Sequence, residues 1–149
     1  MCLCVYTAKH LINNSLVPKI ADTDILVYKL LSLSSNGKIY TPYQGYRIDF
    51  KEGTFVYPQT KIGKLNGISF FVPYIDEGIH SCFSKNAITR IFNVRLYSNY
   101  DNIYYAIIPK GSEYYIGMDG DIVSNNLIVF ENKEIYNKYE STHKVTIIE

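Results

Sequence analysis

The chain has 149 residues, of which 47% are hydrophobic and 19% charged, a composition typical of one folded domain. Lysine and arginine total 15 against 14 for aspartate and glutamate, so the net charge is +1. This value excludes a bulk attraction to nucleic acid or to an acidic membrane. Tyrosine is frequent, with 15 residues, and tryptophan is absent. Such rings suit either a large core or the walls of a ligand pocket.

The N-terminal residues do not resemble a secretory signal, because Lys9 and His10 interrupt the short apolar start. Apolar runs such as residues 68–74 and 103–109 are much shorter than the roughly 20 residues of a membrane-spanning helix. The three cysteines are an odd number and do not form the disulfide framework of a small secreted protein. We therefore expect a soluble protein of the cytoplasm.

Strand-like patterns dominate the chain, because short runs of β-branched and aromatic residues are bounded by glycine, proline, asparagine and serine. The predicted strands are residues 22–33, 38–40, 46–50, 55–57, 68–74, 102–109, 112–116, 122–131 and 145–148. Asn36-Gly37 predicts a tight hairpin turn over residues 34–37, and residues 51–54 are the next predicted turn. Pro73 has no backbone N–H, so it should end the pairing of its strand or mark an edge.

One segment has the pattern of a convincing helix. Ser84 is a good N-cap residue, and the apolar side chains of Ile88, Ile91 and Phe92 recur at spacings of three and four. This pattern predicts a helix over about residues 84–97.

The segments at the two ends of the chain have no clean strand or helix period, apart from the predicted strand over residues 145–148. Residues 1–20 are interpreted as an N-terminal arm and residues 132–149 as a polar, helix-compatible C-terminal segment. Together with the strands and the helix they form a single domain over residues 1–149. The predicted fold class is α+β: a β-rich domain with a mostly antiparallel sheet and one principal helix.

The bend between two predicted strands, residues 41–47, gathers side chains that suit recognition of a nucleotide. Tyr43 and Tyr46 supply stacking rings, and Gln44 and Arg47 supply an amide and a planar cation for a base or a phosphate. The alternative is a plain turn whose tyrosines pack on the core.

Lys110 opens a second candidate, because it follows a predicted strand and begins a turn with Gly111. The ammonium and the backbone N–H groups of such a turn can bind an anion, and Tyr114 and Tyr115 follow closely. The segment lacks the glycine pattern of a P-loop. We include these residues as candidate ligand-binding residues, with an ordinary turn as the alternative.

His80 is the best titratable candidate in the chain. Beside Cys82 it could act as an acid or base, although no third group is visible in the sequence to orient the imidazole. If the protein is an enzyme, we expect His80 to be catalytic. The alternative is a structural histidine that is hydrogen-bonded near a turn.

Cys2 and Cys4 repeat the spacing of His80 and Cys82, so each pair would share one face of a strand and the four could bind zinc. Structural zinc sites usually have CxxC spacing, which this sequence lacks. Buried cysteines mostly pack as small apolar groups. We therefore expect no metal ion and no other cofactor.

Four segments resemble, in the same order, a loosely defined group of small bacteriophage proteins, notably of phages of gut bacteria. They are ADTDILVYKLL at residues 21–31, TPYQGYRI at 41–48, GIHSC at 78–82 and IPKGSEYYIGMDGDIVSN at 108–125. The resemblance implies a role in host manipulation, counter-defence or the virion. It assigns no catalytic residue.

Three functions fit this context. The first is binding and sequestration of a nucleotide-derived host-defence signal without catalysis, for which rings, cations and amides suffice. The second is an enzyme acting on a nucleotide or ADP-ribose-type ligand, with His80 as acid or base. The third is a virion or protein-interaction subunit with exposed tyrosines. We expect the first, in a protein that forms a homo-oligomer.

Overall fold

Short strands make up most of the regular structure. The computed structural model describes residues 3–4, 18–41, 47–62, 66–69, 72–75, 78–92, 103–117 and 120–148. The strands are β1 (Leu3–Cys4), β2 (Lys19–Ile20), β3 (Asp24–Leu30), β4 (Ser32–Leu33), β5 (Ile39–Tyr40), β6 (Arg47–Ile48), β7 (Thr54–Val56), β8 (Asn66–Ser69), β9 (Val72–Ile75), β10 (Ile79–Cys82), β11 (Ile103–Ile108), β12 (Glu113–Ile116), β13 (Asp121–Ser124), β14 (Ile128–Phe130) and β15 (Val145–Ile147). The helices are α2 (Lys85–Phe92) and α3 (Lys133–Glu140).

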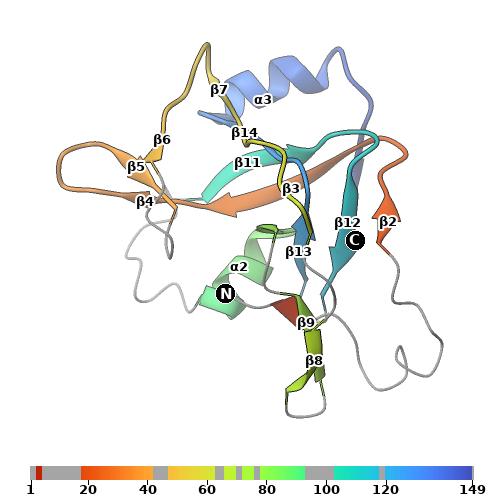
Figure 1. Cartoon of the computed structure of the whole chain (residues 1–149). Helices are drawn as coiled ribbons and strands as arrows, with labels where there is room; N and C mark the ends of the chain where they lie inside the picture. The colour runs from red at the N-terminus through yellow and green to blue at the C-terminus, as the bar shows by residue number, and fades with distance from the viewer. Residues whose placement is uncertain are drawn as a thin grey trace.

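A nine-stranded sheet forms the centre of the molecule (Figure 1). Its strands follow the order β2-β12-β13-β10-β3-β11-β14-β7, and β15 lies beside β3. The strands pair antiparallel, except that β15 runs parallel to β3 and pairs Val145 with Asp24 and Ile147 with Leu26. β11 therefore occupies one edge of β3, while β10 and β15 share the other edge.

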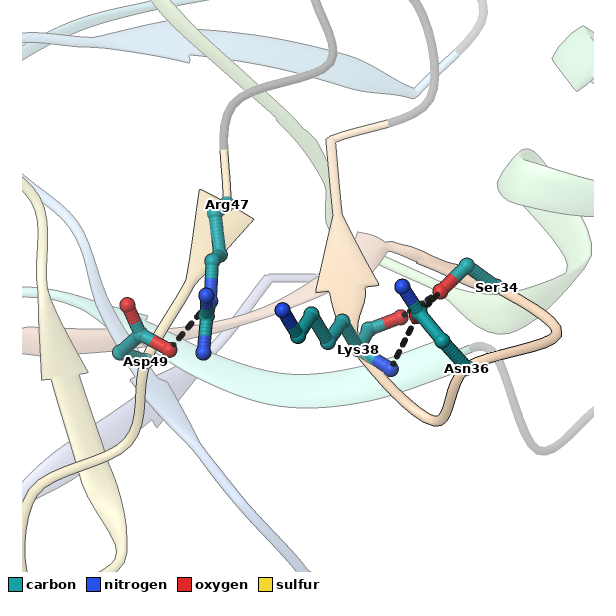
Figure 2. A network of polar contacts seen from close by, with 5 residues as sticks. All are labelled: Ser34, Asn36, Lys38, Arg47 and Asp49. Carbon is teal, nitrogen blue, oxygen red and sulfur yellow. Dashed lines mark hydrogen bonds and ion pairs between the residues drawn. The ribbon is translucent and has the colours of Figure 1, made fainter.

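Two three-stranded sheets extend from this centre, in the orders β4-β5-β6 and β1-β9-β8. The β4–β5 hairpin has the predicted tight turn, in which Gly37 N donates to Ser34 O at 3.0 Å and Gly37 has a φ of 81°. Glycine adopts this left-handed conformation without strain. The Ser34 hydroxyl also donates to Lys38 O at 2.9 Å and contacts Asn36 Oδ1, which closes the turn (Figure 2).

Each face of β3 has its own apolar cluster, because successive side chains of a strand point to opposite sides. Val27 and Leu31 belong to the larger cluster, which lies on what we call the inner face of the sheet. On the opposite face, which we call the helix face, Leu26 packs with Tyr136 of α3 and Leu30 packs with Ile88 of α2. The two helices therefore cover neighbouring parts of one face.

The structure confirms the β-rich composition and the mostly antiparallel sheet. The prediction of one principal helix is wrong, because the structure has a second helix. This helix, α3, has eight residues, the same length as α2. Asn132 caps α3 by accepting a hydrogen bond from Ile135 N at 3.0 Å. The helix is polar because only one side of it contacts the sheet, so its sequence lacks a broad apolar stripe. Residues 93–97 of the predicted first helix lie outside the described residues.

The predicted strand over residues 68–74 is also wrong. The chain there forms two strands, β8 and β9, which pair antiparallel with Ser69 opposite Val72. Pro73 lies within β9, and the pairing register shifts between Asn66 and Ser69 on the neighbouring strand. A residue without an N–H cannot complete a regular ladder, which accounts for an irregular partner strand.

The end segments both contribute strands to the main sheet. In the N-terminal arm, β2 pairs with β12. In the C-terminal segment, α3 covers part of the helix face and β15 pairs with β3. No helix within the described ranges is long and apolar enough to cross a membrane.

Candidate functional site

A groove of about 400 Å³ lies where the first turn of α2 approaches β15. A volume of this size is within the range of small-molecule sites. The described residues that line it are Tyr28, Phe83, Ser84, Lys85, Asn86, Ile147 and Ile148. They come from β3, from the start of α2 and from the C-terminal strand, three parts of the chain that only the folded sheet brings together.

The shared edge of β3 explains why a groove forms at this point. β10 pairs with β3 through Cys82 and Tyr28, whereas β15 pairs with Asp24 to Leu26 of the same edge. After Cys82 the chain leaves the sheet and enters α2. The two strands therefore leave a gap along the edge of β3, and the side chains around it form the walls of the groove.

Lys85 gives the groove a fixed positive charge. Its Nζ lies 5.0 Å from the ring centroid of Tyr105 and 5.7 Å from that of Tyr28. The two rings meet edge to face, with their centroids 5.1 Å apart, and both attract the ammonium through their electron-rich faces. Burial, reinforced by the neighbouring Tyr105, raises the pKa of Tyr28, so its hydroxyl remains a neutral donor at physiological pH.

The start of α2 adds to this positive charge. Ser84 caps the helix by accepting a hydrogen bond from Ala87 N at 3.0 Å. The first turn of α2 contains no acidic residue, whereas Glu134 lies in the first turn of α3. The N-terminus of a helix carries a partial positive charge, which acidic residues normally offset. At α2 a lysine stands at this end instead, so the helix end and the ammonium both attract an anion.

The apolar walls complete the groove. Ile147 of β15 is 60% exposed, and Phe83 is also among the lining residues. No histidine, cysteine or carboxylate is among the lining residues of the described chain. The Ser84 hydroxyl already caps the helix. The groove therefore offers an ammonium group and apolar surfaces for binding a flat anionic molecule.

The bend over residues 41–47 is only partly described. Tyr43, Gln44 and Tyr46 lie outside the described residues. Arg47 is exposed on β6, where its Nε lies 2.8 Å from Asp49 Oδ1 in an ion pair (Figure 2). Its guanidinium thus interacts with a neighbouring carboxylate and is distant from the groove in sequence and topology.

Lys110 is exposed in the turn between β11 and β12, and its backbone N donates to Asp24 Oδ1 at 2.8 Å. Asp24 is the first residue of β3, while Arg47 belongs to the small sheet that follows the last residue of β3. β3 has seven residues and is roughly 20 Å long. The structure therefore does not bring Lys110 and Arg47 together.

Tyr115 and His80 lie in one row, because each is paired with Val123 of β13 from opposite sides. Their side chains share one face of the sheet. Tyr114 lies on the other face, where it is paired with Ser124 and packs against the inner cluster. Tyr114 and Tyr115 thus cannot line the same site on the sheet surface.

His80 and Cys82 share one face of β10, as their spacing predicts. Cys82 is buried in the apolar cluster that contains Leu30 and Ile88. Cys2 lies outside the described residues, and Cys4 is described through its backbone in β1, which lies against β13. Within the described ranges, no three His, Cys, Asp or Glu residues form a group that could hold a metal ion. The zinc hypothesis is untested at its two N-terminal residues.

Comparison with known proteins gives no detectable match: no family model, no curated protein and no solved structure is similar to the chain. The function must therefore be argued from the groove itself. Sequence reasoning identified Ser84 as a helix start but missed Lys85 and Tyr28. The sequence feature that indicates the site is the lysine that directly follows the N-cap, where an acidic residue is usual.

Proposed function

We propose that the protein binds and sequesters a small nucleotide-derived molecule, without changing it, in the groove between α2 and β15. The observation that carries this proposal is the Lys85 ammonium held over the rings of Tyr28 and Tyr105 at the edge of a groove. A nucleotide combines a flat apolar ring system with an anionic phosphate. These are the two properties that the lining residues complement.

The two parts of such a ligand would occupy different parts of the groove. The phosphate meets Lys85 and the N–H groups of the first turn of α2. The base lies against the apolar side chains of Phe83 and Ile147. Because the described lining residues include no histidine, cysteine or carboxylate, we favour binding without reaction over the enzymatic alternative that uses His80. His80 is not among the lining residues.

The setting of this function comes from the sequence. We propose an α+β accessory protein of phage type that acts in the cytoplasm of an infected bacterium and removes a nucleotide signal of host defence. A homo-oligomer is part of the proposal. It is supported by Ile20 and Val56, which are 54% and 63% exposed on the outer strands β2 and β7, because unprotected edge strands favour association. Light scattering coupled to size-exclusion chromatography measures this state.

Binding is tested with purified protein and three probes: AMP, ADP-ribose and a cyclic dinucleotide. At least one should raise the melting temperature, and calorimetry should then give a dissociation constant. Replacing Lys85 by Gln removes the charge and should weaken binding at least about tenfold, equivalent to about 1.4 kcal/mol. Chromatography of the released probe should recover it intact.

The matched control is Lys133→Gln. Lys133 is also the first residue of an eight-residue helix, and it is exposed, so this variant makes the same chemical change at the corresponding position of α3. It should bind the probe as the wild type does. Equal weakening in both variants, or recovery of a chemically altered probe, would contradict the proposal.

A further inference from the structure

A second polar cluster lies on the inner face of the sheet, away from the groove. Lys29 of β3 points to this face between the buried side chains of Val27 and Leu31. Its Nζ donates to the backbone oxygen of His80 at 2.5 Å and lies 5.7 Å from the ring centroid of Tyr57. A lysine directed toward an aliphatic core is rare unless its charge is compensated.

Ser81 lies beside this lysine on the next strand. The antiparallel pairing of Cys82 with Tyr28 places Ser81 next to Lys29, on the same face. Ser81 is only 5% exposed, and its Oγ has no hydrogen-bond partner among the described residues. A buried hydroxyl without a partner is uncommon and calls for an unseen group that would accept or donate a hydrogen bond.

Tyr57 supplies the third group. Its hydroxyl is buried and also has no partner among the described residues, while its ring faces the Lys29 ammonium. Burial raises the pKa of Tyr57, so the hydroxyl keeps its proton. The two orphaned hydroxyls therefore belong to residues that both neighbour Lys29.

Within the described ranges, no ion pair neutralises the charge of Lys29. Lys29 has three N–H donors, of which one is used by His80 O, and no carboxylate of the described residues forms an ion pair with it. Burial lowers the pKa of Lys29 to about 8, against a smaller opposing effect of Cys82, so the amine is still mostly protonated at neutral pH. All three groups can donate a hydrogen bond, and the ammonium can only donate.

We propose that Lys29, Ser81 and Tyr57 together hold a small monovalent anion of the halide type. Such an ion neutralises the ammonium and accepts hydrogen bonds from both hydroxyls, which a cation cannot do. The surrounding Val27 and Leu31 side chains are aliphatic, so they offer no further donors for the several oxygens of a large polyanion. The site is independent of the groove, because it shares no residue with the groove lining.

Chloride and bromide are the probes. At constant ionic strength and neutral pH, replacing gluconate by chloride should raise the melting temperature of the full chain by about 3 °C, and the rise should saturate with concentration. Crystals grown in bromide should show its anomalous signal between Lys29 Nζ, Ser81 Oγ and the Tyr57 hydroxyl.

Three variants assign the effect to these residues. Lys29→Met should abolish the chloride response, and the near-isosteric changes Ser81→Ala and Tyr57→Phe should each weaken the apparent chloride affinity about tenfold. Lys38→Met removes the same charge from the exposed β4–β5 hairpin and should keep the full response. If Lys29→Met does not fold, the two hydroxyl variants still decide the question.

Two results would overturn the proposal. One is a wild-type melting temperature that is equal in chloride and gluconate. The other is a chloride response that is unchanged in both Ser81→Ala and Tyr57→Phe, since the ion would then bind elsewhere and water would be the better candidate for the unseen group. Neither result affects nucleotide binding at the groove, which is measured with different probes.

Discussion

The hydroxyl of Tyr139 donates a 2.6 Å hydrogen bond to Asp24 Oδ2, which joins the C-terminal helix α3 to the first residue of the central strand β3. The other carboxylate oxygen of Asp24 accepts a hydrogen bond from Lys110 N at 2.8 Å. His143 stacks flat on the Tyr139 ring, with centroids 3.8 Å apart. Asp24 therefore connects α3, β3 and the β11–β12 turn.

We expect Tyr139→Phe to lower the free energy of unfolding by about 1–2 kcal/mol, because a hydrogen bond to a carboxylate is lost while the ring packing remains. Urea denaturation measures this change. Burial and the bond to Asp24 raise the pKa of Tyr139, so its stabilisation is complete below its ordinary pKa of 10.0 and is lost as the pH rises beyond that value. The difference between the two proteins should shrink in strong base; a constant difference would contradict this assignment.

Lys29 should make stability depend on pH in the opposite direction. Its pKa is lowered from 10.5 to about 8 in the fold, so between these values the unfolded chain binds more protons than the folded one, and stability rises with pH. In halide-free buffer, raising the pH from about 7.5 to 9.5 should stabilise wild type relative to Lys29→Met by on the order of 1 kcal/mol. Saturating chloride should reduce this gain. Parallel pH profiles of the two proteins would show that the amine is not desolvated.

Alanine substitutions at Gly53 and Gly37 distinguish the cost of backbone strain from the cost of steric crowding. Both have left-handed conformations, with φ of 84° and 81°. A Cβ on Gly53 would overlap Ile135 of α3, whereas a Cβ on Gly37 would meet nothing within 4 Å. Alanine at Gly37 should cost about 1 kcal/mol, and alanine at Gly53 about 2 kcal/mol more because of overpacking. Thermal and urea unfolding measure both values, and equal costs would mean that α3 shifts freely.

Elemental analysis of the purified protein should show no stoichiometric zinc, since Cys82 packs with Leu30 and Ile88 in an apolar cluster. One zinc per chain that is lost in Cys82→Ala, but retained in an unrelated surface variant, would establish the alternative.

Local chemistry made the turns and most strands predictable from sequence. Asn36-Gly37 indicates the β4–β5 hairpin, and the Lys51–Thr54 turn follows from Gly53, because only certain residues tolerate a positive φ. The strand after Ser69 was harder to predict, since an apolar run shows that residues are buried but not where the chain reverses. The second helix was predicted only as a helix-compatible segment, because a helix that contacts the sheet along one side remains mostly polar.

The candidate groove was also not predictable from the sequence, but the reason is different. It depends on two strands, β10 and β15, pairing with one edge of β3, and pairing between distant segments leaves no local pattern in a single sequence. Lys85 and Tyr28 have no special spacing along the chain, although the fold places them within cation–π distance. Part of the tyrosine excess, by contrast, has a structural explanation: Tyr105 packs against both Tyr28 and Tyr136 on the helix face.

The parallel pairing of β15 with β3 also bears on the order of folding. Val145 pairs with Asp24 across most of the chain, and contacts between such distant segments carry a high cost in loop-closure entropy. We therefore expect the wall that contains Ile147 to be among the last parts of the sheet to assemble. A newly synthesised chain has no complete groove until β15 pairs with β3. A ligand of the groove therefore binds only copies of the protein that have finished folding.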